Sequence, residues 1–193
     1  MQNEKINVKD YINIGVFTAI YIVIFMIVGM MGFIPILLFI YPGAIGLACA
    51  LPIFILISKT RKFGVLSITA VILTLFMLVT GHPWFGILIS LPAGIIGDWI
   101  MKLGSYKNWM NLLSGYCVFS LWVLGGFAPF FFVRENYFKQ LEKGYGKDYV
   151  TAISTLFSYE MIPVLILVCV IGAAIGAWIS RGLLKKHFTN LVN

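Results

Sequence analysis

The chain has 193 residues, of which 61% are apolar and only 11% are charged. Soluble domains carry about 25% charged residues, so this composition excludes a water-soluble fold. The formal net charge of +7 is not arranged as a basic stripe with interleaved aromatics, which argues against nucleic-acid binding. We therefore expect an all-α membrane protein, with a single transmembrane domain over residues 1–193.

The N-terminal part of the chain contains a long uncharged segment, from Tyr11 to Ser58. One helix of that length would be about twice as long as the ~30 Å hydrocarbon core of a bilayer. The segment from Gly29 to Pro35 favours a break, because glycine loosens a helix end and proline lacks an amide donor. This predicts two membrane helices, at about residues 11–32 and 35–57.

The remaining apolar segments predict four more membrane helices. Gly81-His82-Pro83 is typical of a tight turn and divides the next apolar segment into helices at about 64–80 and 84–102. Two further segments, at about 108–133 and 160–181, each suit the ~20 residues that cross a bilayer. Continuous apolarity without a period of two favours helices over barrel strands. The sequence thus predicts six transmembrane helices.

The positions of the basic residues predict the orientation of these helices. With the N-terminus inside, ten lysines and arginines lie on the cytoplasmic side and four lie outside, at 134, 139, 143 and 147. Cytoplasmic loops carry the excess of basic residues, so we expect both termini inside a bacterial cytoplasmic membrane. The external segment, 134–159, shows helical spacing of apolar residues after Gly146, which predicts a short amphipathic helix.

Small residues recur at a spacing of four in the first, fourth and sixth predicted helices. The pairs are Gly15 with Ala19, Ser90 with Gly94, Ala93 with Gly97, Gly172 with Gly176, and Ala173 with Ala177. This spacing lets another helix backbone approach closely. We expect the later pairs to pack inside the bundle. For Gly15 and Ala19, packing inside the bundle and contact with another subunit both stay open.

Polar and aromatic residues gather near the predicted outer ends of helices 3 to 6. They are His82, Trp84, Trp122, Arg134 and Glu160. Ionisable and aromatic groups that border a membrane cavity favour a solute-binding site. The alternative is interfacial anchoring, with Trp84 in an aromatic belt and Arg134 as a snorkelling residue.

Asp98 lies inside a predicted span, and Lys102 follows four residues later, which suits an ion pair on one helix face. The sequence contains no His-Glu-x-x-His, no Gly-x-Ser-x-Gly and no phosphate-binding loop. The three cysteines lie far apart in apolar segments, without a zinc or disulfide spacing. We therefore expect no catalytic residue, no metal and no cofactor.

Six sequence segments resemble one family of membrane proteins. They are Lys-Asp-Tyr-Ile-Asn-Ile-Gly-Val-Phe-Thr-Ala at 9–19, Thr-Gly-His-Pro-Trp at 80–84, Phe-Ser-Leu-Trp-Val-Leu-Gly-Gly-Phe at 119–127, Phe-Phe-Val-Arg-Glu-Asn-Tyr-Phe at 131–138, Gly-Tyr-Gly at 144–146, and Gly-Leu-Leu-Lys-Lys-His-Phe at 182–188. The chain resembles the S components of energy-coupling factor (ECF) transporters, particularly the bacterial Trep_Strep family. The likeness covers essentially the whole chain.

This resemblance implies a six-helix subunit that captures a scarce nutrient outside and docks on a T subunit driven by two ABC ATPases. In the family, helix 1 carries an Ala-x-x-x-Ala groove for the T subunit, which here falls on Gly15 and Ala19. Glycine replaces the first alanine, but the residue stays small.

The cargo of such a subunit has to be argued from its site residues. Arg134 and His82 would favour a carboxylate or phosphate, Glu160 an amine, and Tyr41, Trp84 and Trp122 a ring. A small vitamin-like or heterocyclic nutrient is the expected cargo. The alternatives are an intramembrane enzyme that uses His82, Asp98 or Glu160, and a structural membrane protein.

Overall fold

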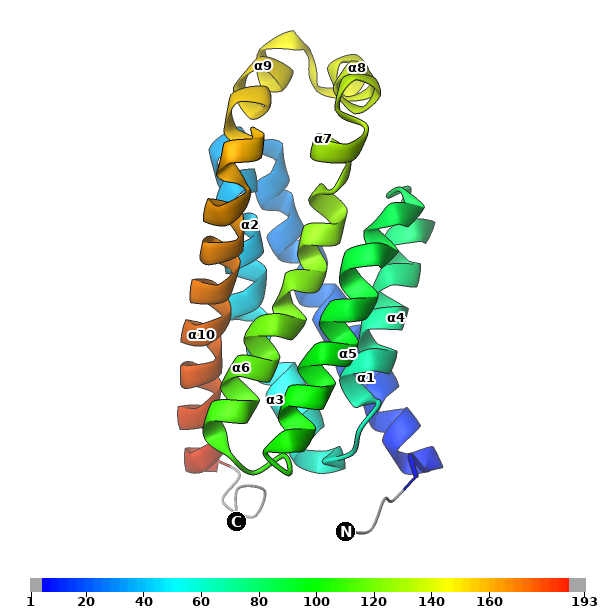
Figure 1. Ribbon diagram of the computed structural model, residues 1–193, viewed down its shortest axis with the longest axis vertical. Coiled ribbons are helices and arrows are strands. Elements are labelled where there is room, and N and C mark those ends of the chain that lie inside the picture. The colour runs from blue at the N-terminus through cyan, green and yellow to red at the C-terminus, as the bar shows by residue number, and fades with distance from the viewer. Residues whose placement is uncertain (1–4, 188–193) are drawn as a thin grey trace.

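The computed structural model describes residues 5–187, and every regular element in that range is helical. Figure 1 shows an upright bundle that has the start of α1 and the end of α10, the termini of the described chain, at one end and α8 and α9 across the other end. We call the α8–α9 layer, residues 134–156, the arch.

The chain passes through the bundle as six helical segments. The first is α1 (Val8–Gly29) with η1 (Met30–Phe33), and the second is α2 (Pro35–Ala48) with α3 (Ala50–Thr60). The third is α4 (Val65–Val79), and the fourth is η2 (Trp84–Gly86) with α5 (Ile87–Leu103). The fifth contains α6 (Trp109–Ser120), η3 (Leu121–Phe127) and α7 (Pro129–Phe132). After α8 (Arg134–Tyr145) and α9 (Lys147–Leu156), the last is η4 (Tyr159–Met161) with α10 (Ile162–His187).

Within residues 5–187, five segments are long and apolar enough to cross a membrane. They are Val8–Phe33, Pro35–Thr60, Trp84–Leu103, Trp109–Phe127 and Tyr159–Lys186. α4 is apolar but has only 15 residues, which is about 22 Å at 1.5 Å per residue. The sequence predicts six membrane helices. In the described residues, five of these segments are long enough to cross a membrane, and the sixth, α4, is a shorter apolar helix.

Two segments depart from the predicted continuous helices. The second segment of the chain, α2 with α3, is interrupted at Cys49. This residue lies three positions before Pro52, whose missing N–H cannot donate to the carbonyl of Ala48. The fifth tightens into a 3₁₀ helix from Leu121 to Phe127, a stretch that contains Gly125 and Gly126.

The segment 134–159, which is predicted to be external, holds two helices, whereas the sequence predicts one. Gly146 separates α8 from α9 with a φ of 86°, a left-handed conformation that glycine adopts without steric cost. α8 is rich in charged residues, so it lacks the continuous apolarity that identified the other helices.

Close backbone contacts hold the long helices together. A Cβ added to Gly172 on α10 would lie 2.0 Å from the carbonyl oxygen of Gly43 on α2. A Cβ on Gly97 would lie 2.7 Å from the carbonyl oxygen of Gly115 on α6. The prediction that the later small-residue pairs pack inside the bundle is confirmed, because side chains there would force the backbones apart.

Asp98 joins α5 to the start of α4. Its Oδ2 atom accepts hydrogen bonds from the backbone N–H groups of Gly64 (2.8 Å) and Ser67 (3.1 Å) and from the Ser67 hydroxyl (3.0 Å). The carboxylate therefore satisfies amides that the first turn of α4 leaves unpaired. The predicted pair with Lys102 is wrong, because the ammonium of Lys102 lies over the Phe63 ring, 5.0 Å from its centroid.

Candidate functional site

A cavity of about 300 Å³ lies beneath the arch, at the end of the bundle opposite the termini. Its lining comes from α1, η1, α2, the end of α4, the loop that follows it, η3, α7 and the arch. The lining residues are Phe25, Gly29, Gly32, Phe33, Leu38, Tyr41, Met77, His82, Val123, Gly126, Phe127, Phe130, Tyr137, Leu141, Tyr145 and Tyr149. We call this space the aromatic cavity, because half of its lining residues carry aromatic rings other than imidazole.

Stacked phenylalanines form one wall of the aromatic cavity. The Phe130 ring is parallel to that of Phe157, with 4.4 Å between centroids, and Phe127 stacks on Phe157 at 5.4 Å. Phe157 is fully buried and follows α9 directly, so this stack fixes the end of the arch on η3 and α7. Each ring of the wall also packs against a further aromatic ring, which is Phe39 for Phe157, Tyr41 for Phe127 and Tyr137 for Phe130.

The floor of the cavity rests on a hydrogen-bonded tryptophan. The Trp122 indole N–H donates to the Tyr21 hydroxyl at 2.7 Å, and both side chains are buried. Phe25 lies between this pair and the cavity, 5.4 Å from Trp122 and 5.8 Å from Tyr41 by ring centroids. Trp122 therefore supports the floor, while Tyr41 lines the cavity itself.

His82 borders the aromatic cavity and a smaller one of about 20 Å³ between α4 and α5. Its Nδ1 lies 3.3 Å from the Thr80 hydroxyl. Burial lowers the pKa of His82, so the imidazole is neutral at pH 7 and can both donate and accept a hydrogen bond. It contributes polarity to the cavity without a charge.

Three tyrosines of the arch line the cavity roof. Tyr137 and Tyr145 lie on α8, and Tyr149 on α9 donates its hydroxyl to the Gly32 carbonyl at 2.6 Å. Burial raises the pKa of Tyr149 to about 12, so its hydroxyl stays protonated at neutral pH. The sequence predictions do not include these residues, although Tyr137, Leu141 and Tyr145 recur at a spacing of four, a helical stripe on α8 that could have identified part of the roof.

Arg134 holds the two arch helices together. Its Nη1 atom donates to the carbonyls of Phe157 and Phe130, and its Nη2 atom donates to the Ser154 carbonyl at 2.7 Å. These carbonyls include groups at the end of α9 that have no partner inside the helix. Arg134 also stacks on Phe138, with its Cζ 4.8 Å from the ring centroid. It does not line the aromatic cavity.

The chain matches one family model, described as a hypothetical bacterial integral membrane protein (Trep_Strep), over residues 8–190. It belongs to the Trep_Strep family. No curated protein and no solved structure matches it. The five apolar spans agree with this family description and make the Trep_Strep chain a multi-pass protein of the bacterial cell membrane.

Two of the predicted site residues of this Trep_Strep protein lie away from the aromatic cavity. Trp84 on η2 is 68% exposed and contacts Phe85 at 6.1 Å between ring centroids. Glu160 is exposed on η4 and is absent from the cavity lining. Of the six predicted residues, only Tyr41 and His82 line the cavity. Trp122 packs below its floor and Arg134 binds the arch above it, and neither side chain reaches the cavity.

Gly15 and Ala19 lie on the exposed face of α1 in the Trep_Strep chain. A Cβ added to Gly15 would meet no atom within 4 Å. Nearby on α1, Ile12 and Val16 are also exposed, so the small residues lie on an apolar surface. Within residues 5–187, no group of three potential metal ligands comes together.

Proposed function

We propose that this chain is the solute-binding S component of an ECF-type importer and that the aromatic cavity holds the solute. One observation carries the proposal, namely a cavity of about 300 Å³ under a roof of separate helices at one end of a membrane bundle. Small-molecule sites in proteins are clefts of about this size, mostly apolar with a few placed polar groups.

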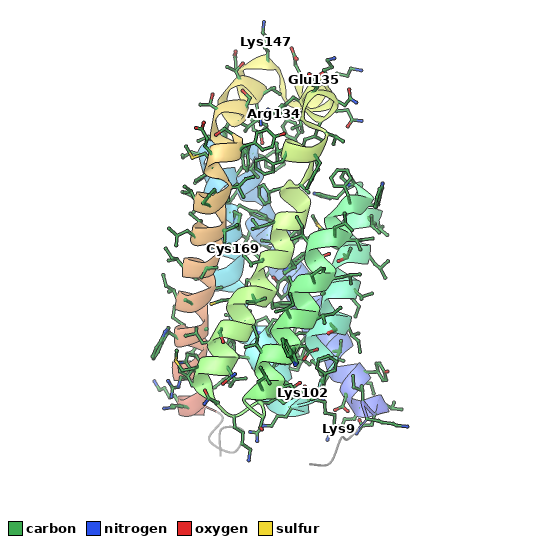
Figure 2. All side chains as sticks on the ribbon, viewed as in Figure 1. Lys9, Lys102, Arg134, Glu135, Lys147 and Cys169 are labelled. Atoms are coloured by element: carbon green, nitrogen blue, oxygen red, sulfur yellow. The ribbon has the colours of Figure 1, made fainter. Side chains whose placement is uncertain are left out.

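The charge distribution supports an extracellular cavity. Figure 2 shows Lys9 and Lys102 near the end with the termini, and Arg134, Glu135 and Lys147 at the arch. The ten basic residues near the termini, against four in the arch, predict cytoplasmic termini and an external arch. In this topology α4 is the sixth span. Its exposed Val71, Leu75 and Val79 give it an apolar surface suited to lipid.

The lining of the cavity favours an uncharged ring compound. Among its lining residues there is no aspartate, glutamate, lysine or arginine. Tyrosine hydroxyls and the neutral His82 can donate or accept hydrogen bonds, and the phenylalanine wall can stack on a planar solute. A carboxylate or phosphate that entered this cavity would lose its hydration and gain no cationic partner, which is costly in an apolar site. We therefore propose a neutral aromatic or heterocyclic nutrient.

The exposed face of α1 supports docking on a partner. A membrane helix gains affinity for another helix where small residues let the backbones approach, and Gly15 and Ala19 offer such a place. We propose that a T subunit covers this face and that its ABC ATPases supply the energy. Asp98 lies where α5 contacts the start of α4, at the end of the bundle with the termini, whereas His82 borders the cavity at the other end. The separation of Asp98 from His82 and Glu160 supports binding rather than intramembrane catalysis.

The decisive experiment is mass spectrometry of small molecules that co-purify with the detergent-extracted protein. We expect a ring-containing solute with the parent protein and with Trp84→Leu, whose side chain lies outside the cavity. Tyr41→Ala should lose that solute, because it removes a ring from the cavity lining. Equal recovery of the same molecules from all three proteins would place the solute elsewhere.

The proposed orientation has its own test. A cysteine in place of Tyr145 on the arch should react with a membrane-impermeant thiol reagent added to intact cells. A cysteine in place of Arg61, at the other end, should react only after the cells are opened. The reverse pattern would place the aromatic cavity on the cytoplasmic side and exclude a role in capture.

A further inference from the structure

A second cavity, of about 280 Å³, lies at the end of the bundle that carries the termini. It is bordered by the end of α3, the loop before α6, the start of α6 and the end of α10. The residues that line it are Phe54, Ile57, Ser58, Arg61, Tyr106, Lys107, Trp109, Leu112, Arg181, Leu184 and Lys185. We call it the basic cavity.

The basic cavity has a one-sided charge. Arg61, Lys107, Arg181 and Lys185 line it, and no lining residue is acidic. Asp10 and Asp98, the two acidic residues of the described chain at this end, do not line the cavity, although Asp98 lies close to the lining residue Tyr106. Asp10 pairs with Lys62 at 2.8 Å, and Asp98 accepts from the start of α4. A cleft lined by one sign of charge attracts counter-ions, so this cavity favours an anion.

Aromatic rings hold one of these cations in place. The Arg181 guanidinium lies over Trp109, with 4.5 Å from Cζ to the ring centroid, and 5.7 Å from the centroid of Trp178. Phe54 packs on the other part of this wall, 5.8 Å from Trp109. Stacking uses the face of a guanidinium and leaves its in-plane N–H donors available to a phosphate.

The backbone around the basic cavity is strained. In residues 5–187, the non-glycine residues with positive φ are Arg61 (49°), Ser105 (51°) and Tyr106 (56°). Arg61 and Tyr106 line the cavity, and Ser105 precedes Tyr106. Left-handed backbone is unfavourable at such residues and is retained where the surroundings require it. Tyr106 is buried here, and Lys107 follows it directly in the chain.

The surroundings of the opening favour a lipid over a soluble anion. Trp178 is 56% exposed beside Arg181, and the apolar Met110 and Leu183 are exposed on the adjoining turns of α6 and α10. Exposed tryptophan next to arginine and lysine at a helix end is typical of the membrane interface, where lipid phosphates lie. An apolar surface next to a cationic pocket suits a phosphate that is attached to acyl chains.

We propose that the basic cavity binds the phosphate group of an anionic phospholipid, with Lys107, Arg181 and Lys185 as its cationic ligands. The glycerol and the first methylenes of the acyl chains lie against Trp109, Trp178 and Leu184. The site is separate from the aromatic cavity and does not depend on the cargo or on a transport partner.

The test is native mass spectrometry of the purified protein with added phosphatidylglycerol or phosphatidylcholine. The parent protein should retain phosphatidylglycerol in preference to phosphatidylcholine. The triple variant Lys107→Gln, Arg181→Gln, Lys185→Gln should bind phosphatidylglycerol about a hundredfold more weakly, at about fivefold for each charge near a membrane surface. The matched control Lys139→Gln, Lys143→Gln, Lys147→Gln loses the same charge on the arch and should change binding less than twofold.

Three results would overturn the proposal: equal retention of phosphatidylglycerol by both triple variants, equal retention of the two lipids by the parent, or displacement of the lipid by glycerol 3-phosphate at matched concentration. The last result would assign the cavity to a soluble phosphate ester. If Arg181→Gln prevents folding, the double variant Lys107→Gln, Lys185→Gln tests the same idea, because both lysines are exposed. It should still weaken phosphatidylglycerol about twentyfold.

Discussion

The α2–α10 contact and the exposed face of α1 have small residues at the same spacing. The small residues of the contact are covered by another helix, whereas those of α1 are exposed. A Cβ on Gly172 would lie 2.0 Å from a backbone oxygen of α2, whereas a Cβ on Gly15 would meet nothing within 4 Å. In a membrane, lipid tails contact apolar side chains as favourably as another helix does. Helices therefore associate where small residues let their backbones approach closely. The first face already has its partner helix inside the chain. The second face remains open and is suited to a helix from another protein.

The largest expected effect tests the closed face. Gly172→Ala should destabilise the protein by about 3 kcal/mol, because the new methyl group overlaps Gly43 and the two helices have to separate. Reversible unfolding in mixed detergent and dodecyl sulfate micelles measures this change. Gly182→Ala on the same helix is the control, since a Cβ there meets no atom within 4 Å. Equal stability of the two variants would contradict the close α2–α10 contact.

A smaller effect tests another contact inside the bundle, between Asp98 on α5 and the start of α4. Asp98→Ala should cost about 2 kcal/mol, because it leaves the N–H groups of Gly64 and Ser67 without their acceptor at the start of α4. The same unfolding assay applies. Glu142→Ala, an exposed acid on α8, should change stability by less than about 0.5 kcal/mol. If both variants unfold alike, the Asp98 carboxylate is not a cap.

The roof of the aromatic cavity should show a still smaller effect. Tyr149→Phe removes the hydroxyl that donates to Gly32 at 2.6 Å and should cost about 1 kcal/mol. Hydrogen exchange of the arch, residues 134–156, should become faster in this variant while that of α10 stays the same. Unchanged exchange in the arch would mean that the ring stack alone holds the roof.

The open face of α1 should show almost no effect on stability. The double variant Gly15→Leu, Ala19→Leu places both side chains outward, so we expect a change of less than about 0.5 kcal/mol in unfolding. Co-purification of a T subunit with the chain should nevertheless be lost, because leucines hold the two backbones apart. A large loss of stability would show that this face packs against the chain itself.

Helix positions were largely readable from the sequence, whereas the cavity lining was not. Charge-free segments and turn residues such as Gly81 and Pro83 delimit apolar helices without reference to their neighbours. The lining residues come from eight parts of the chain, and one sequence does not show which helix faces meet. Arg134 illustrates the difficulty, because a charge near a predicted outer end suggests a solute contact, yet it donates to the backbone carbonyls of Ser154 and Phe157 at the end of the arch.

By itself, the sequence determined that the chain is an all-helical protein of a membrane, because apolar segments of this length are stable only where lipid surrounds them and helices satisfy the backbone. The tertiary structure decided which small residues are covered, that Asp98 binds the start of α4 and not Lys102, and that tyrosines of the arch close an aromatic cavity. The physical reason is that side-chain partners depend on the rotation and depth of each helix. Those are set by packing between distant segments and not by the hydropathy of any one of them.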